Sequence, residues 1–131
     1  MKKYIRINLR FSSPIGVGSG APRRHEARPS PIIWPLEMAN GFLTAIRRGR
    51  LPETKASALI GALDRLQVDI DRGVAPEFLT KATLTVGLAH RVSAYDASYL
   101  ELAMRRGLPL ATQDERLVRA AGTAGIEILQ L

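Results

Sequence analysis

The sequence contains no cysteine in its 131 residues, which excludes disulfide bonds and cysteine-based zinc sites and favours a reducing compartment. It also lacks long apolar runs, because charged residues interrupt every such stretch before the roughly 18–20 residues that a membrane span needs. No apolar segment followed by a cleavage site begins the chain. These absences lead us to expect a cytoplasmic protein that neither enters a membrane nor is exported.

The hydrophobic fraction, 46%, is that of a globular protein, and the length suits one domain. The net charge of +7 is distributed unevenly. Residues 1–36 contain seven Lys or Arg and one Glu, whereas residues 37–131 contain twelve basic and eleven acidic residues. A basic N-terminal segment can attract a polyanion such as RNA by counterion release, or it can simply remain solvated.

The first 30 residues differ in pattern from the rest. Residues 4–11, YIRINLRF, alternate apolar and polar positions and predict a strand with one face in water. Between residues 10 and 31, 17 of 22 residues are Gly, Ala, Pro, Arg or Ser, which predicts loop or disorder. We therefore divide the chain into an atypical basic N-terminal segment, residues 1–30, and a folded domain, residues 31–131.

The domain alternates helices with short apolar strands, which is typical of an α/β fold with a parallel sheet. Apolar residues cover most of the circumference of its first helix and predict burial on two sides, against the core and against a partner. The expected helices span about 34–46, 52–66, 76–90, 95–106 and 114–124, and the expected strands span 67–70, 108–112 and 126–129.

Three acidic residues stand at the starts of these helices: Glu37, Asp96 and Asp114. A helix of about eleven residues from Asp96 is roughly 16 Å long. The five-residue strand LPLAT returns over roughly the same length. Asp114 therefore comes back to the level of Asp96, at the sheet edge where ligands bind in parallel α/β folds.

Two interpretations of these acids remain open. Any one of them suits a helix cap or first turn, where a carboxylate satisfies free N–H groups and the helix dipole. Three on one edge repel one another unless a cation lies between them, and Mg²⁺ prefers oxygen ligands. The second interpretation predicts a divalent-metal site.

Three blocks of the chain resemble one known family. WPLEMANGFLTAIRRGRL (34–51), SAYDASYLELAMRRGLPLATQDERL (93–117) and AAGTAGIEIL (120–129) are similar to the PIN-domain ribonucleases, specifically the VapC-type toxins of bacterial toxin–antitoxin pairs. The resemblance implies a three-layer α/β sandwich with a central, mostly parallel sheet flanked by helices. It also implies endonucleolytic cleavage of RNA and inhibition by a cognate antitoxin. The wide apolar surface of the helix at 36–46 predicts an interface with a second copy of the chain, as a homodimer, or with an antitoxin segment.

Carried over position by position, the resemblance assigns the catalytic and metal-binding acids to Glu37, Asp96 and Asp114, with Thr112 as an auxiliary polar neighbour. The implied cofactor is Mg²⁺, with Mn²⁺ as an alternative. Such an ion lowers the pKa of a bound water, orients it for attack on phosphorus and stabilises the departing oxygen. No serine, cysteine or histidine nucleophile is required.

The chain departs from the family at its N-terminus. The family pattern opens with a central apolar strand that ends in Asp, whereas no Asp precedes Asp64 here. We hypothesise that residues 1–30 are a replaced or out-of-frame N-terminus on an otherwise normal PIN domain. Glu26 has no spacing that recommends it as a substitute. The alternative function is a catalytically impaired PIN-like module that binds RNA or an antitoxin.

Other motifs are weaker. GVGSGA (16–21) matches a dinucleotide-binding fingerprint but is followed by no helix. His25 and His90 are interpreted as solvent-facing or helix-end residues, and Tyr95 and Tyr99 are expected to pack in the core. Four arginines at helix C-termini are explained by the helix dipole and by solvation: Arg47, Arg48, Arg105 and Arg106.

Overall fold

The computed structural model describes residues 5–6, 28–66 and 68–129. Its helices are α1 (Trp34–Arg47), the short 3₁₀ helix η1 (Glu53–Lys55), α2 (Ala56–Asp64), α3 (Pro76–His90), α4 (Ala94–Arg106) and α5 (Glu115–Thr123). Its strands are β1 (Ile5–Arg6), β2 (Arg28–Ser30), β3 (Val68–Ile70), β4 (Leu110–Ala111) and β5 (Ile128–Leu129). No helix in these three ranges has the length and apolar character needed to span a membrane.

The class is α/β, as predicted, and every described strand pairing is parallel. β1, β4 and β5 form one sheet, and β2 and β3 form another. β1 also lies beside β2, so the two sheets are neighbours. The strands have only two or three residues each, and these small sheets do not by themselves amount to a three-layer sandwich.

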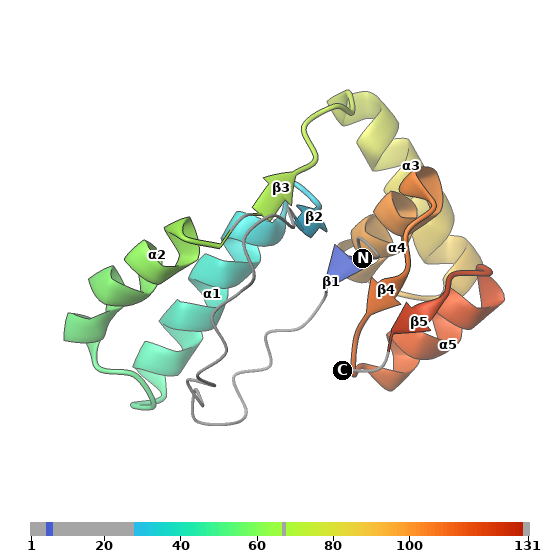
Figure 1. Cartoon of the computed structure of the whole chain (residues 1–131). Coiled ribbons are helices and arrows are strands. Elements are labelled where there is room, and N and C mark those ends of the chain that lie inside the picture. The colour runs from blue at the N-terminus through green and yellow to red at the C-terminus, as the bar shows by residue number, and fades with distance from the viewer. Residues whose placement is uncertain (1–4, 7–27, 67, 130–131) are drawn as a thin grey trace.

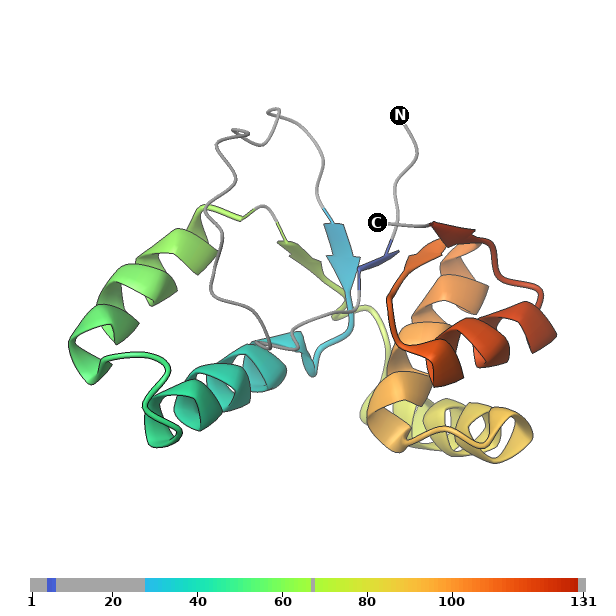
Figure 2. The ribbon, with the colours of Figure 1, turned by 90° about the horizontal axis from the view of Figure 1, so that it is seen from below.

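Helices stand on both sides of the strands (Figure 1). α1 and α2 lie on one side, whereas α3, α4 and α5 gather on the other, together with β4 and β5. The view from below shows the same division (Figure 2). A side chain on α1 that contacts α4 or α5 must therefore reach across the strands.

The core is centred on α4. Seven consecutive residues of this helix, 97–103, are buried, and the largest fully buried side chains are Leu100, Leu102, Leu110 and Leu117. α3 packs closely against α4. Gly87 lets the turn between the two helices fold closely onto α3, because a Cβ there would lie 3.3 Å from the carbonyl oxygen of Val92.

The structure describes a single chain, in which the first helix is buried on its core side, and its predicted burial against a partner stays a prediction. α1 buries Met38, Phe42 and Ala45, but Leu36 and Leu43 are 71% and 48% exposed. The helix packs on one side only, and the helix buried around its circumference is α4. Apolar residues around a helix do not reveal which of its faces the described part of the fold covers.

The prediction of loop or disorder up to residue 31 is wrong for residues 28–30. They form β2, which pairs with β3, and Ser30 accepts a hydrogen bond of 2.9 Å from the Asp71 N–H. This strand has no apolar alternation, so backbone pairing rather than a side-chain pattern defines it. The other N-terminal predictions, including most of the strand at 4–11, fall outside the described residues.

A cluster of charged residues joins the C-terminal end of α4 to β3 and the residue that follows it. Asp71, which is 8% exposed, accepts hydrogen bonds from Arg105 and, at 2.7 Å, from Arg106. Arg105 also binds Glu101 at 2.7 Å, and Arg106 lies 3.4 Å from Asp69. Arg105 and Arg106 are therefore paired, and the prediction that dipole and solvent alone explain them is wrong.

Candidate active site

Glu37 lies in the first turn of α1, whose start is fixed by Pro35 in its first turn. No side chain caps the start of this helix, and this includes the side chain of Glu37. Its half-buried side chain extends instead to α4, where Oε2 accepts a hydrogen bond from the Tyr99 hydroxyl. Glu37 therefore occupies the first-turn position that the helix-dipole interpretation predicts, but it makes no cap, and its carboxylate faces another helix.

Asp96 lies in the first turn of α4, but the cap of that helix is Ser93. The Ser93 hydroxyl accepts a hydrogen bond of 3.1 Å from the Asp96 backbone N–H. The Asp96 carboxylate is half-buried and is also hydrogen-bonded to Ser93. Ser93 caps the helix, and Asp96 holds the first-turn position that the helix-dipole interpretation also predicts.

Asp114 is the residue for which the cap interpretation is confirmed. Its Oδ1 accepts hydrogen bonds from the backbone N–H groups of Arg116, at 2.9 Å, and Leu117, at 3.3 Å. Thr112 is 5% exposed, and its Oγ1 accepts a hydrogen bond of 3.1 Å from the Asp114 N–H. These contacts fix the turn between β4 and α5.

Burial and the charges of neighbouring acids shift the pKa values of Glu37 and Asp96. Burial raises the pKa of Glu37, and the charge of Asp96 adds to this rise, while the Tyr99 hydrogen bond opposes it. Burial likewise raises the pKa of Asp96, and the charge of Asp114 adds to it, while Ser93 and the charge of Arg116 oppose it. Asp96 is thus linked electrostatically to both other acids, and we call Glu37, Asp96 and Asp114 the acidic row.

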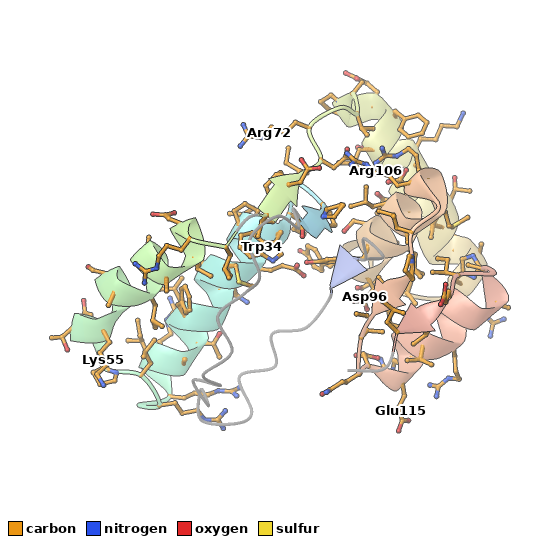
Figure 3. The ribbon with its side chains drawn as sticks, viewed as in Figure 1. Trp34, Lys55, Arg72, Asp96, Arg106 and Glu115 are labelled. Carbon is orange, nitrogen blue, oxygen red and sulfur yellow. The ribbon has the colours of Figure 1, made fainter. Side chains whose placement is uncertain are left out.

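Figure 3 shows where one member of the acidic row, Asp96, lies on the molecule. Asp96 and Arg106 are seen toward opposite ends of α4, with Asp96 near β1. Ten residues of helix separate them, which is about 15 Å. The acidic row and the cluster around Asp71 are therefore separate features at the two ends of one helix.

The carboxylate oxygens suit a hard divalent cation, but they do not form a ready three-ligand cage. Across the described ranges, no three His, Cys, Asp or Glu side chains are grouped so that one metal ion could take all of them. Mg²⁺ usually needs only one or two carboxylates and completes its shell with water and substrate phosphate. By donor chemistry, the carboxylates of Glu37 and Asp96 suit Mg²⁺ or Mn²⁺.

Sequence reasoning missed the role of Tyr99. The residue is 2% exposed, so the prediction of core packing is confirmed, but its hydroxyl bonds a site acid 62 positions away. The one available signal was its spacing, because residues three apart share a helix face and Tyr99 follows Asp96 by three. Tyr95, also expected in the core, is 62% exposed, and that prediction is wrong.

His90 is the last residue of α3, as predicted, and its buried Nδ1 has no partner among the described residues. Glu26, His25 and the GVGSGA motif lie outside the described residues. No protein-family model matches the chain, and no curated protein matches it.

Proposed function

We propose that this chain is a metal-dependent endoribonuclease toxin of the VapC type, which hydrolyses phosphodiester bonds in RNA. The observation that carries the proposal is the row of Glu37, Asp96 and Asp114. These acids come from the starts of three helices, and the charge of Asp96 raises the pKa of Glu37 while the charge of Asp114 raises the pKa of Asp96. They are also the positions at which the sequence resembles the PIN-domain ribonucleases.

Glu37 and Asp96 would hold a Mg²⁺ or Mn²⁺ ion, with Asp114 on the other side of Asp96. Such an ion supplies a bound water of lowered pKa and a positive charge for the departing oxygen. Carboxyl groups bind a cation only when they are ionised. The raised pKa values of Glu37 and Asp96 move their ionisation to higher pH. We therefore expect metal affinity to fall on acidification.

Three further residues support the acids. The Ser93 hydroxyl holds Asp96, and Thr112 holds the turn that carries Asp114. Arg116 is exposed, and its charge lowers the pKa of Asp96, so a cation lies close to the acids. A positive charge at this place favours the approach of an RNA phosphate to a site that would otherwise repel it.

The fold and partners form part of the same proposal. The short parallel strands with helices on both sides support a PIN-like three-layer sandwich. The exposed Leu36 and Leu43 on α1 support an interface there, with a second copy of the chain or with a cognate antitoxin. We place the protein in the cytoplasm.

The direct test is to incubate the protein with structured RNA and Mn²⁺. We expect wild-type protein to cut internal bonds and Asp96→Asn to lose at least the roughly 10–100-fold that the loss of a metal-site partner costs. Asp64→Asn is the matched control, because Asp64 is an exposed carboxylate at the end of α2. Cleavage that survives Asp96→Asn while folding is unchanged would contradict the assignment.

The absence of any Asp before Asp64 favours a second candidate function, a PIN-like module that binds RNA or an antitoxin without cutting. The same experiment separates the two functions. RNA that is retained by the wild-type protein on a filter but stays intact with Mn²⁺ supports the binding module. Cleavage that depends on Asp96 excludes it.

A further inference from the structure

The Tyr99 hydroxyl is a fixed point beside the acidic row. Its ring lies in the core of α4 and is 2% exposed, packed among buried residues that include Leu100 and Leu102. A ring packed in this way has little freedom to rotate, because protein cores are filled at crystal-like density. The position of the hydroxyl is therefore set by the core and not by the site.

Glu37 is the less constrained partner in this hydrogen bond. Its side chain has three rotatable bonds, it is half-buried, and it reaches across from α1 to α4. A buried hydroxyl that loses its hydrogen-bond partner carries an uncompensated desolvation penalty. The hydrogen bond is therefore favourable for the hydroxyl and for the carboxylate, and it links the flexible Glu37 side chain to the rigid Tyr99 ring.

We propose that Tyr99 is a positioning residue of the cation site, whose hydroxyl holds Glu37 Oε2 toward α4 and leaves Oε1 to take the cation beside Asp96. This inference rests on the proposed metal-dependent function and adds a residue to it. Tyr99 does not touch the cation or the RNA. It acts through Glu37, so its effect must disappear when Glu37 can no longer bind a cation.

The test measures Mn²⁺ affinity of the full chain, without RNA, from the electron paramagnetic resonance signal of free Mn²⁺. We expect Tyr99→Phe to weaken binding by roughly 10-fold, within the range seen for outer-shell partners of metal ligands. Tyr95→Phe is the matched control, because Tyr95 lies on the same helix and is 62% exposed. It should leave the affinity unchanged.

A double-mutant cycle with Glu37→Gln distinguishes positioning from general structural damage. If Tyr99 acts through Glu37, Tyr99→Phe has no further effect on Mn²⁺ affinity in the Glu37→Gln protein. Equal weakening in both backgrounds overturns the inference, as does a Tyr99→Phe protein that binds Mn²⁺ like the wild type.

Glu37→Asp provides a test that leaves the core intact. It keeps the charge but withdraws the carboxylate from the Tyr99 hydroxyl by one methylene. It should weaken Mn²⁺ binding by about the same factor as Tyr99→Phe, and unchanged affinity overturns the inference even where Tyr99→Phe does not fold.

The outcomes also separate this inference from the proposed activity. Mn²⁺ binding that depends on Tyr99, in a protein that leaves RNA intact, supports the positioning role and overturns the ribonuclease activity alone. Wild-type protein that binds no Mn²⁺ overturns the positioning role together with the cation site.

Discussion

Asp71 shows how a single residue ties the segment after β3 to the C-terminal end of α4. Its side chain is 7% exposed, and it is paired with both Arg105 and Arg106. Burial on its own would raise its pKa, but the hydrogen bonds and charges of the two guanidinium groups outweigh burial and hold the pKa below its ordinary value. The folded protein therefore binds this proton less readily than the unfolded chain does.

Asp71→Asn should lower the free energy of unfolding by about 2 kcal/mol at pH 7, because it removes charge-assisted hydrogen bonds from a buried site. The contribution of Asp71 is complete above its unfolded pKa of about 3.9 and is lost as pH falls through the lower folded value. Urea unfolding of both proteins between pH 7 and pH 2 measures it. Stability curves that run parallel down to the lowest pH would contradict this role.

Asp96 has the opposite balance. Burial and the charge of Asp114 raise its pKa, so the folded state disfavours the ionised form. Its contribution to stability is complete below the unfolded pKa of about 3.9 and is lost as pH rises through the folded value. At neutral pH the metal-free protein therefore carries a destabilising charge.

Asp96→Asn should raise the free energy of unfolding of the metal-free protein at pH 7 by about 0.5–1 kcal/mol, the usual exchange of stability for function at a site. Asp64→Asn, at an exposed position, should change it by less than about 0.5 kcal/mol. Chemical unfolding with a chelator present measures both. A less stable Asp96→Asn protein would show that the carboxylate is a structural ligand of the fold.

At the scale of residues, the sequence located the acids but not their roles. The helix and strand lengths around residues 96–114 predicted that Asp96 and Asp114 would share one edge of the sheet, and the charge of Asp114 raises the pKa of Asp96. Whether an acid caps its helix depends on the neighbouring residues. At the start of α4 the cap is Ser93 and not Asp96. The Tyr99 to Glu37 bond joins positions 62 apart, and no local pattern reports such a contact.

Among the helices and strands, the boundaries that were predicted correctly are those at which one residue fixes the backbone conformation. α3 was predicted at 76–90 and spans those residues, because Pro76 begins it and Arg91 takes a left-handed conformation after it. The predicted strand at 108–112 shortens to β4, since strand ends depend on pairing with β1 and β5. β2 was not predicted, because its position too is defined by backbone pairing with another strand, β3.

Gly107 ends α4 with φ 59°, the left-handed region that favours glycine. Gly107→Ala should lower the free energy of unfolding by about 1 kcal/mol through backbone strain alone, because an added Cβ meets nothing within 4 Å. Gly122→Ala is the matched control inside α5, where a Cβ also meets nothing. There the higher helix propensity of alanine should raise stability by about 0.5 kcal/mol.

Thermal unfolding of the two alanine variants measures this contrast. Opposite shifts of the melting temperature support the conformational role of Gly107. Equal shifts would mean that the turn after α4 adopts another conformation in solution.

At the scale of the whole molecule, the sequence predicted the α/β class and the alternation of elements. It did not predict which helix lies at the centre. α4 and α1 both have apolar residues over much of their surface, but only α4 is enclosed by neighbours in the described part of the fold. The covering of a helix is set by the arrangement of all the elements, which one helix's sequence does not contain.

The uncovered face of α1 leads to the last prediction. Leu36 and Leu43 are two turns apart on one face of α1, and they are 71% and 48% exposed. Exposed apolar side chains at such spacing favour association with a partner surface. A chain of 14.3 kDa should therefore run at twice its mass in sedimentation equilibrium at micromolar concentration.

The double variant Leu36→Lys and Leu43→Lys should sediment at the mass of a single chain and keep its helical circular dichroism, because both positions face solvent in the monomer. Leu88→Lys is the matched control, since Leu88 is 73% exposed on α3, across the strands from α1. It should remain dimeric. A dimer that survives the α1 substitutions but is lost with Leu88→Lys would move the interface to α3, and a monomeric wild-type protein would leave the α1 face to the antitoxin.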